Sequence, residues 1–198
     1  MLLPMFIFAL IGSISPGPVN IIATGSGASF GFWRPIPYVL GATIAYTLIV
    51  LLVGLGLNYW LTVFPEITNT LQYVGSVFLL YMSYKIATAA PMDSEKRTEN
   101  KQPPSLIEGA LAQGLNPKAW LVSMSGVSLF VTTQSQAMLY LLIFCLISFT
   151  VCLFGISTWA AIGYSIRGLL STTKRLISFN ILMGLMLSGT VVSILFNH

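Results

Sequence analysis

The chain has 198 residues, of which 56% are hydrophobic and 7% are charged. A soluble domain carries about 25% charged residues, so this composition excludes a water-facing surface and predicts an integral membrane protein. The formal net charge of +4 does not indicate a nucleic-acid partner, because the basic residues fall at the ends of apolar segments, as membrane topology requires.

Six apolar segments follow one another along the chain. Each is long and continuously apolar, which favours helices over the alternating strands of about ten residues that form membrane barrels. No Lys or Arg precedes Arg34, so the first segment is expected to be a retained helix rather than a signal peptide. The sequence predicts an all-α integral membrane protein with six transmembrane helices at residues 3–28, 38–57, 71–89, 106–131, 137–164 and 176–196.

The connections between these segments differ sharply in charge. Eight of the nine Lys and Arg residues lie at or in the first, third and fifth connections, whereas residues 58–70 and 132–136 contain none. The positive-inside rule places the three basic connections in the cytoplasm and both termini outside, on the periplasmic side if the cell has a periplasm. The polar stretch 91–104 is expected to be a flexible cytoplasmic tether between two halves, residues 1–90 and 105–198.

Lys118 is the ninth basic residue and does not fit in a connection. The apolar run that follows it, residues 119–131, spans 13 positions, whereas a transmembrane helix needs roughly 20. The helix therefore begins near residues 106–111 and carries Lys118 into the membrane. A charge there costs roughly 3 kcal/mol and indicates a functional site. The alternative is that Lys118 extends to the cytoplasmic interface as an anchor, with Glu108 nearer that interface.

The first and fourth segments are both interrupted near their middles. The interruptions are Ser15-Pro16-Gly17-Pro18-Val19-Asn20 and Gly114-Leu115-Asn116-Pro117-Lys118. Each half contains an odd number of segments, so the second half is inverted relative to the first. Paired broken helices in two inverted three-helix repeats indicate a transporter binding site. Kinks that serve packing alone are the alternative.

The chemistry of the two interruptions suits an amino acid. Carbonyls freed near residues 12–14 can accept from an ammonium group, and the half-helix that begins at Pro18 offers N–H groups to a carboxylate. Lys118 adds a positive charge or a titratable group. No cofactor, metal site or enzyme activity is expected, because the only histidine is His198 and the segments hold no nucleophile–base arrangement. The expected substrate-binding residues are Pro16, Gly17, Pro18, Asn20, Asn116, Pro117 and Lys118.

These motifs, together with Gly31, Gly41 and Leu115-Asn116-Pro117-Lys118-Ala119, resemble the LysE/RhtB family of bacterial amino-acid exporters over essentially the whole chain. The resemblance implies a small inner-membrane exporter, driven by proton antiport and often a homo-oligomer. Residues 84–88 and Phe154-Gly155 resemble the members that export cysteine and O-acetylserine, which implies a small neutral amino acid or derivative.

One position departs from the family pattern. Many relatives carry an acid about five residues after the glycine that matches Gly41, where this chain has Tyr46. Proton coupling would then fall to Lys118 or Glu108, or be absent. A passive channel and a non-transporting membrane partner remain the alternative functions.

Other small residues in the segments are expected to serve packing. Gly41 with Ala45, and Gly184 with Ser188, have the spacing that lets helices approach closely. Cys145 and Cys152 lie seven apart on one helix, too far apart for a disulfide, and are expected in the core.

Overall fold

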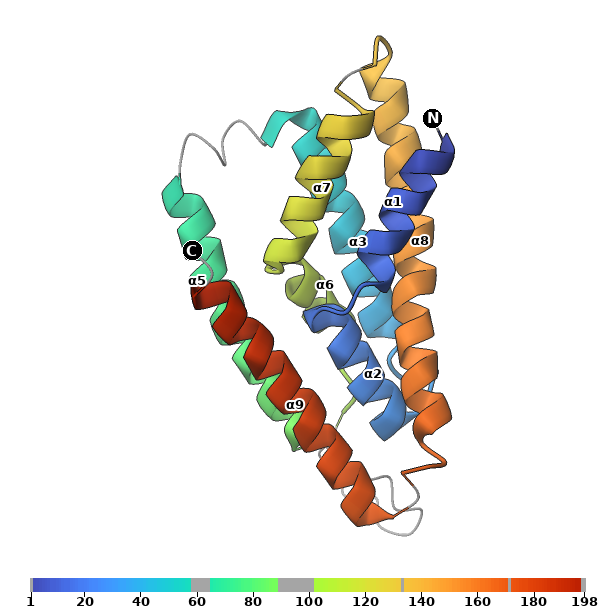
Figure 1. Cartoon of the computed structure of the whole chain (residues 1–198), viewed down its shortest axis with the longest axis vertical. Coiled ribbons are helices and arrows are strands. Elements are labelled where there is room, and N and C mark those ends of the chain that lie inside the picture. Colours follow the sequence, from blue (N-terminus) through green and yellow to red (C-terminus); the bar gives the residue numbers. More distant parts are fainter. Residues whose placement is uncertain (1, 58–64, 89–101, 133, 171, 197–198) are drawn as a thin grey trace.

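The computed structural model describes residues 2–57, 65–88, 102–132, 134–170 and 172–196, and every regular element among them is helical (Figure 1). The predicted all-α class is therefore confirmed for this part of the chain. Most of the predicted tether 91–104, together with His198, lies outside it. The elements are α1 (Leu2–Ile14), α2 (Pro18–Phe30), α3 (Ile36–Leu52), the π-helical turn η1 (Val53–Leu57), α5 (Pro65–Ala87), α6 (Leu106–Gly114), α7 (Pro117–Phe130), α8 (Ala137–Ile166) and α9 (Thr173–Phe196).

Both predicted interruptions are present. The axes of α1 and α2 differ by 60°, and the two interruptions lie at a similar height in the bundle (Figure 1). Within the described residues, Ile36–Gly56 and α8 are each long and apolar enough to cross a membrane, and the bent pair α1–α2 meets the same test when taken together.

Proline explains where each broken helix restarts. Pro18 and Pro117 are the first residues of α2 and α7, a position where the missing N–H has no helical partner in any case. Gly17 precedes α2 in an extended conformation. Asn116 precedes α7, and its side-chain oxygen accepts a hydrogen bond from the Lys118 backbone N–H at 3.2 Å. The local sequence thus ends one half-helix and begins the next.

The cytoplasmic half-helices, named for the predicted orientation, pack closely across the two halves of the chain. Helix α6 lies along α3, and α2 lies along α8. Gly41 and Gly109 each face a backbone carbonyl of the opposite helix, and Gly27 and Gly163 make the same approach between α2 and α8. A Cβ at any of the four would clash with that carbonyl. The predicted packing role of Gly41 is confirmed.

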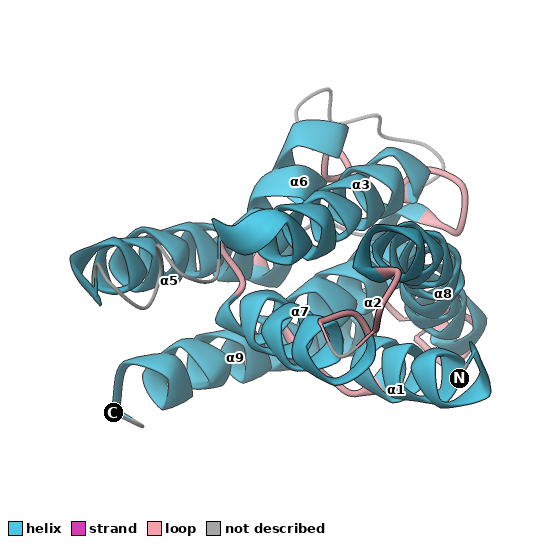
Figure 2. Ribbon diagram, turned by 90° about the horizontal axis from the view of Figure 1, so that it is seen from above, coloured by secondary structure: helices cyan, strands magenta, loops and turns pink. Residues whose placement is uncertain are grey.

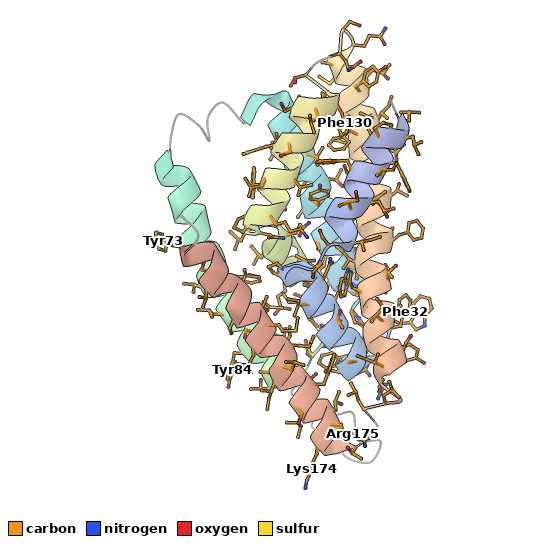
Figure 3. All side chains as sticks on the ribbon, in the orientation of Figure 1. Phe32, Tyr73, Tyr84, Phe130, Lys174 and Arg175 are labelled. Atoms are coloured by element: carbon orange, nitrogen blue, oxygen red, sulfur yellow. The ribbon has the colours of Figure 1, made fainter. Side chains whose placement is uncertain are left out.

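Helices α5 and α9 form a separate pair at one side of the bundle (Figures 1 and 2). The Ser83 hydroxyl donates to the Gly184 carbonyl at 2.7 Å and lies 2.8 Å from the Ser188 hydroxyl. The predicted packing role of Gly184 and Ser188 is confirmed. Tyr73 and Tyr84 project outward from α5 (Figure 3), as do side chains that face lipid.

Candidate substrate site at the two helix breaks

Lys118 joins the two interruptions directly. Its side-chain Nζ donates to the Ser15 carbonyl at 2.8 Å, to the Ser15 hydroxyl at 2.7 Å and to the Pro16 carbonyl at 3.4 Å. The amine of the second broken helix therefore neutralises carbonyls exposed by the break in the first. The side chain lies within the bundle and does not extend along α6 toward Ser105.

Glu108 is not the partner of Lys118. Its carboxylate forms an ion pair with Lys85 at 2.5 Å and accepts from the backbone N–H and the hydroxyl of Ser105, closing a capping box at the start of α6. This network ties the end of α5 to the beginning of α6, away from the interruptions.

The carbonyls freed in α1 accept hydrogen bonds from side chains of the protein itself. Asn20 Nδ2 donates to the carbonyls of Ser13 at 2.8 Å and of Ser15 at 3.0 Å. The Trp159 indole N–H donates to the Ile14 carbonyl at 3.2 Å. A buried backbone carbonyl without a donor is costly, so these side chains stabilise the broken helix.

The second interruption is held by a similar set of polar side chains. Asn116 Nδ2 donates to the Gln113 side-chain oxygen at 3.3 Å, and both residues are buried. The Trp120 indole N–H donates to the Gly114 carbonyl at 2.8 Å. Amide side chains can both donate and accept, so Gln113 and Asn116 can bind either charged group of an amino acid.

A cavity of about 40 Å³ lies between the interruptions. Four of the seven expected residues line it: Gly17, Asn20, Asn116 and Lys118. The three prolines do not, and they act by setting the backbone. None of the described residues that line the cavity is an acid. The full lining is Gly12, Ser13, Gly17, Val19, Asn20, Tyr46, Gln113, Asn116, Lys118, Ala119, Val122, Cys152 and Ile156.

The chain matches the model of the LysE type translocator family over residues 10–197. The protein belongs to this family. The family resemblance is therefore confirmed, and the protein is a transporter rather than an enzyme. The cysteine/O-acetylserine efflux protein of Salmonella typhi is 29% identical over 190 residues, which cover 96% of this chain and 94% of the relative. The corresponding protein of Escherichia coli (strain UTI89 / UPEC) is 28% identical with the same coverage. No solved structure matches.

Some lining residues of this LysE type translocator escaped the sequence prediction. Gln113 carried a signal, because it is a polar residue one turn before Asn116 in an apolar segment. Tyr46 stood out in the sequence as a departure from the family pattern, and the structure places it in the cavity wall. Cys152 was expected in the core; it is buried but also forms part of the cavity wall. Nothing in an evenly apolar helix indicates which side faces a cavity.

Proposed function

We propose that this protein exports small neutral amino acids or their derivatives from the cytoplasm, with cysteine and O-acetylserine as the first candidates. The observation that carries the proposal is the cavity at which Lys118 joins both helix breaks. The names of the relatives, cysteine/O-acetylserine efflux proteins, support the substrate class. The proposed site residues are the seven expected from the sequence together with Gln113 and Tyr46.

The site offers separate places for the two charges of an amino acid. The first N–H groups of α2 have no helical acceptor and form the positive end of its dipole, and with Lys118 they favour a carboxylate. Gln113, Asn116 and Tyr46 line the same cavity, and each carries an oxygen that can accept from an ammonium group. A substrate carboxylate would compete with the Ser15 and Pro16 carbonyls for Lys118.

Substrate binding requires the helices to move. Ligand pockets have volumes of roughly 300–1,000 Å³, whereas this cavity measures about 40 Å³ and holds only a few water molecules. The structure thus favours a closed state of an alternating-access cycle. In the proposed cycle, two inverted halves, residues 1–90 and 105–198, form six transmembrane helices and move relative to each other, with both termini outside.

Proton antiport is the proposed driving force. No described cavity residue is a carboxylic acid, and Glu108 is engaged by Lys85. Lys118 is therefore the leading titratable group for coupling, and Tyr46 and Cys152 are the other titratable groups in the cavity wall.

The test is uptake of labelled O-acetylserine, cysteine and serine into inverted membrane vesicles, with and without an imposed proton gradient. In wild type, we expect the labelled substrate to accumulate inside the vesicles above its outside concentration, and only when the proton gradient is imposed. We expect this accumulation to be lost in Lys118→Ala. Lys174→Ala, which removes an exposed charge, is the matched control. Equilibration without accumulation would indicate a passive channel. Absence of any movement in correctly inserted wild type would indicate a non-transporting membrane protein.

A further inference from the structure

A layer of buried hydroxyls adjoins the cavity. Among the described residues, four buried hydroxyl groups make no hydrogen bond of good geometry: those of Thr43, Ser76, Ser123 and Ser148. The Ser123 hydroxyl lies beside the Tyr46 hydroxyl, and the Thr43 hydroxyl lies beside the Cys152 thiol. Ser123 follows Val122 in α7, and Ser148 lies one turn before Cys152 in α8; Val122 and Cys152 both line the cavity. Ser123 and Ser148 therefore extend the polar wall by one turn, toward the end of the bundle where α7 ends and α8 begins.

Three phenylalanines close that end of the wall. The rings of Phe8 and Phe130 meet edge to face with centroids 5.5 Å apart, and those of Phe130 and Phe144 are 6.1 Å apart. They come from α1, α7 and α8, and Phe130 lies near the far end of α7 (Figure 3). Gly126 leaves room for them, because a Cβ there would lie 2.5 Å from the Phe144 ring. In the aromatic layer, Phe144 lies about one turn from Ser148 along α8, and Phe130 lies about two turns from Ser123 along α7.

The two ends of the bundle are closed in different ways. At the end that the charge pattern assigns to the cytoplasm, α2 and α6 contact α8 and α3 backbone to backbone through Gly27, Gly41, Gly109 and Gly163. At the other end, α1 packs on α8, whereas α7 packs sparsely on α3 and α8, and the rings of Phe8, Phe130 and Phe144 lie between α1, α7 and α8. Opening the glycine-lined end requires whole helices to separate, because their backbones are in contact.

We propose that Ser123 and Ser148 form a second polar station for the zwitterionic substrate on its outward path, and that Phe8, Phe130 and Phe144 are the gate that closes it. The proposal rests on the proposed export function. Hydroxyls buried without good hydrogen bonds in a membrane interior are unfavourable. These hydroxyls gain hydrogen-bond partners when water and substrate enter. Entry requires α1 or α7, the outer half-helices of the two broken segments, to pivot at its break.

The first test removes the two hydroxyls in the double variant Ser123→Ala, Ser148→Ala. Because these groups make no hydrogen bond of good geometry in the closed state, thermal stability should be unchanged or raised, and equilibrium binding of substrate unchanged, while the transport rate falls at least tenfold. The matched controls are Ser125→Ala and Thr150→Val. Both positions are exposed, with hydroxyls that bond their own helices at 2.8 Å and 2.9 Å, and both variants should transport like wild type. A double variant that transports at the wild-type rate overturns the polar station.

The second test measures how readily a reagent passes the gate. In a Cys145→Ser background, Cys152 is the single thiol and lies on the cavity side of the aromatic layer. A membrane-impermeant thiol reagent applied from outside should modify it slowly, and at least tenfold faster in Phe130→Ala or Phe8→Ala. Phe154→Ala removes an exposed ring on α8 and should leave the rate unchanged. Equal rates in the gate variants and in the background protein overturn the gate.

The two proposals fail in distinguishable ways. Labelling of Cys152 requires no substrate, so its rate decides the gate even if no amino acid is transported. Failure of wild type to move any amino acid refutes the export function alone. Faster labelling in Phe130→Ala only when the reagent is applied to the cytoplasmic face would overturn the assignment of the gate to the exit side.

Discussion

Removal of the Lys118 amine is the substitution that acts most directly on both helix breaks. Lys118→Met removes the charge and keeps a stem of similar length. It deletes the two short hydrogen bonds to Ser15 and the longer one to Pro16. The Ser15 carbonyl keeps the Asn20 amide as a donor, so the first break is weakened rather than left without support.

The size of the effect follows from these contacts. A hydrogen bond to a charged group contributes about 1.5–3 kcal/mol, and Lys118 is half-buried, so water replaces part of what is lost. We expect a loss of about 2–3 kcal/mol in the free energy of unfolding. At 2–4 °C per kcal/mol for a chain of this size, the melting temperature falls by roughly 4–12 °C. If the substrate complex loses the same 2–3 kcal/mol of binding free energy, substrate affinity falls roughly 30- to 150-fold.

The assay combines thermal unfolding in detergent with export measured in reconstituted vesicles. Lys174→Met is the control for loss of an exposed positive charge. Lys118→Arg restores charge with a planar group that cannot occupy the same position, so it should recover stability better than transport. A folded Lys118→Met protein that melts within about 1 °C of wild type and transports at the wild-type rate would refute the role of Lys118 at the breaks.

Three further predictions concern helix packing, the first break and the ion pair between Glu108 and Lys85. Gly109→Ala places a Cβ against a backbone carbonyl of α3 and should lower stability by about 1–3 kcal/mol. In the control Gly114→Ala, the added Cβ would meet no atom within 4 Å, so stability should not change. Equal melting temperatures for the two variants would contradict the close approach at Gly109. Asn20→Ala removes two hydrogen bonds; the Ser13 carbonyl loses its side-chain donor, whereas the Ser15 carbonyl keeps Lys118. It should lower stability by about 2 kcal/mol and reduce transport more than tenfold; normal export by this variant would argue against the site. Glu108→Gln breaks the pair with Lys85 and should lower stability by about 1 kcal/mol while leaving transport within twofold. A large loss of transport would return Glu108 to the candidates for coupling.

The helix breaks were predictable because their cause is local. Proline lacks an N–H and disrupts the turn before it, so Pro18 and Pro117 locate the two restarts from the sequence alone. Asn116 as the residue that caps α7 follows from the same local chemistry. The depth of Lys118 followed from the length of the apolar run after it.

The partners across the bundle were not predictable in the same way. Ser15 and Lys118 are separated by 103 residues, and their contact depends on how two inverted halves fit together. Cys152 and Tyr46 face the cavity because of the rotation of α8 and α3 about their axes. Both helices are apolar on every side, so their sequences carry no period that indicates this rotation. Glu108 was considered beside Lys118 because they share a segment, whereas its partner Lys85 comes from the other half.

The crossed packing of the halves also constrains how the chain is made. Helix α2 is buried along almost its whole length and contains the polar run Thr24-Gly25-Ser26-Gly27, which lipid solvates poorly. Its main neighbour is α8, and Thr24 contacts Trp159, 135 residues later. At 5–20 residues per second, that neighbour emerges from the ribosome roughly 7–27 s after α2. During this interval the polar run of α2 lacks its main protein neighbour, so substitutions in residues 18–30 act on membrane insertion as well as on the stability of the finished fold.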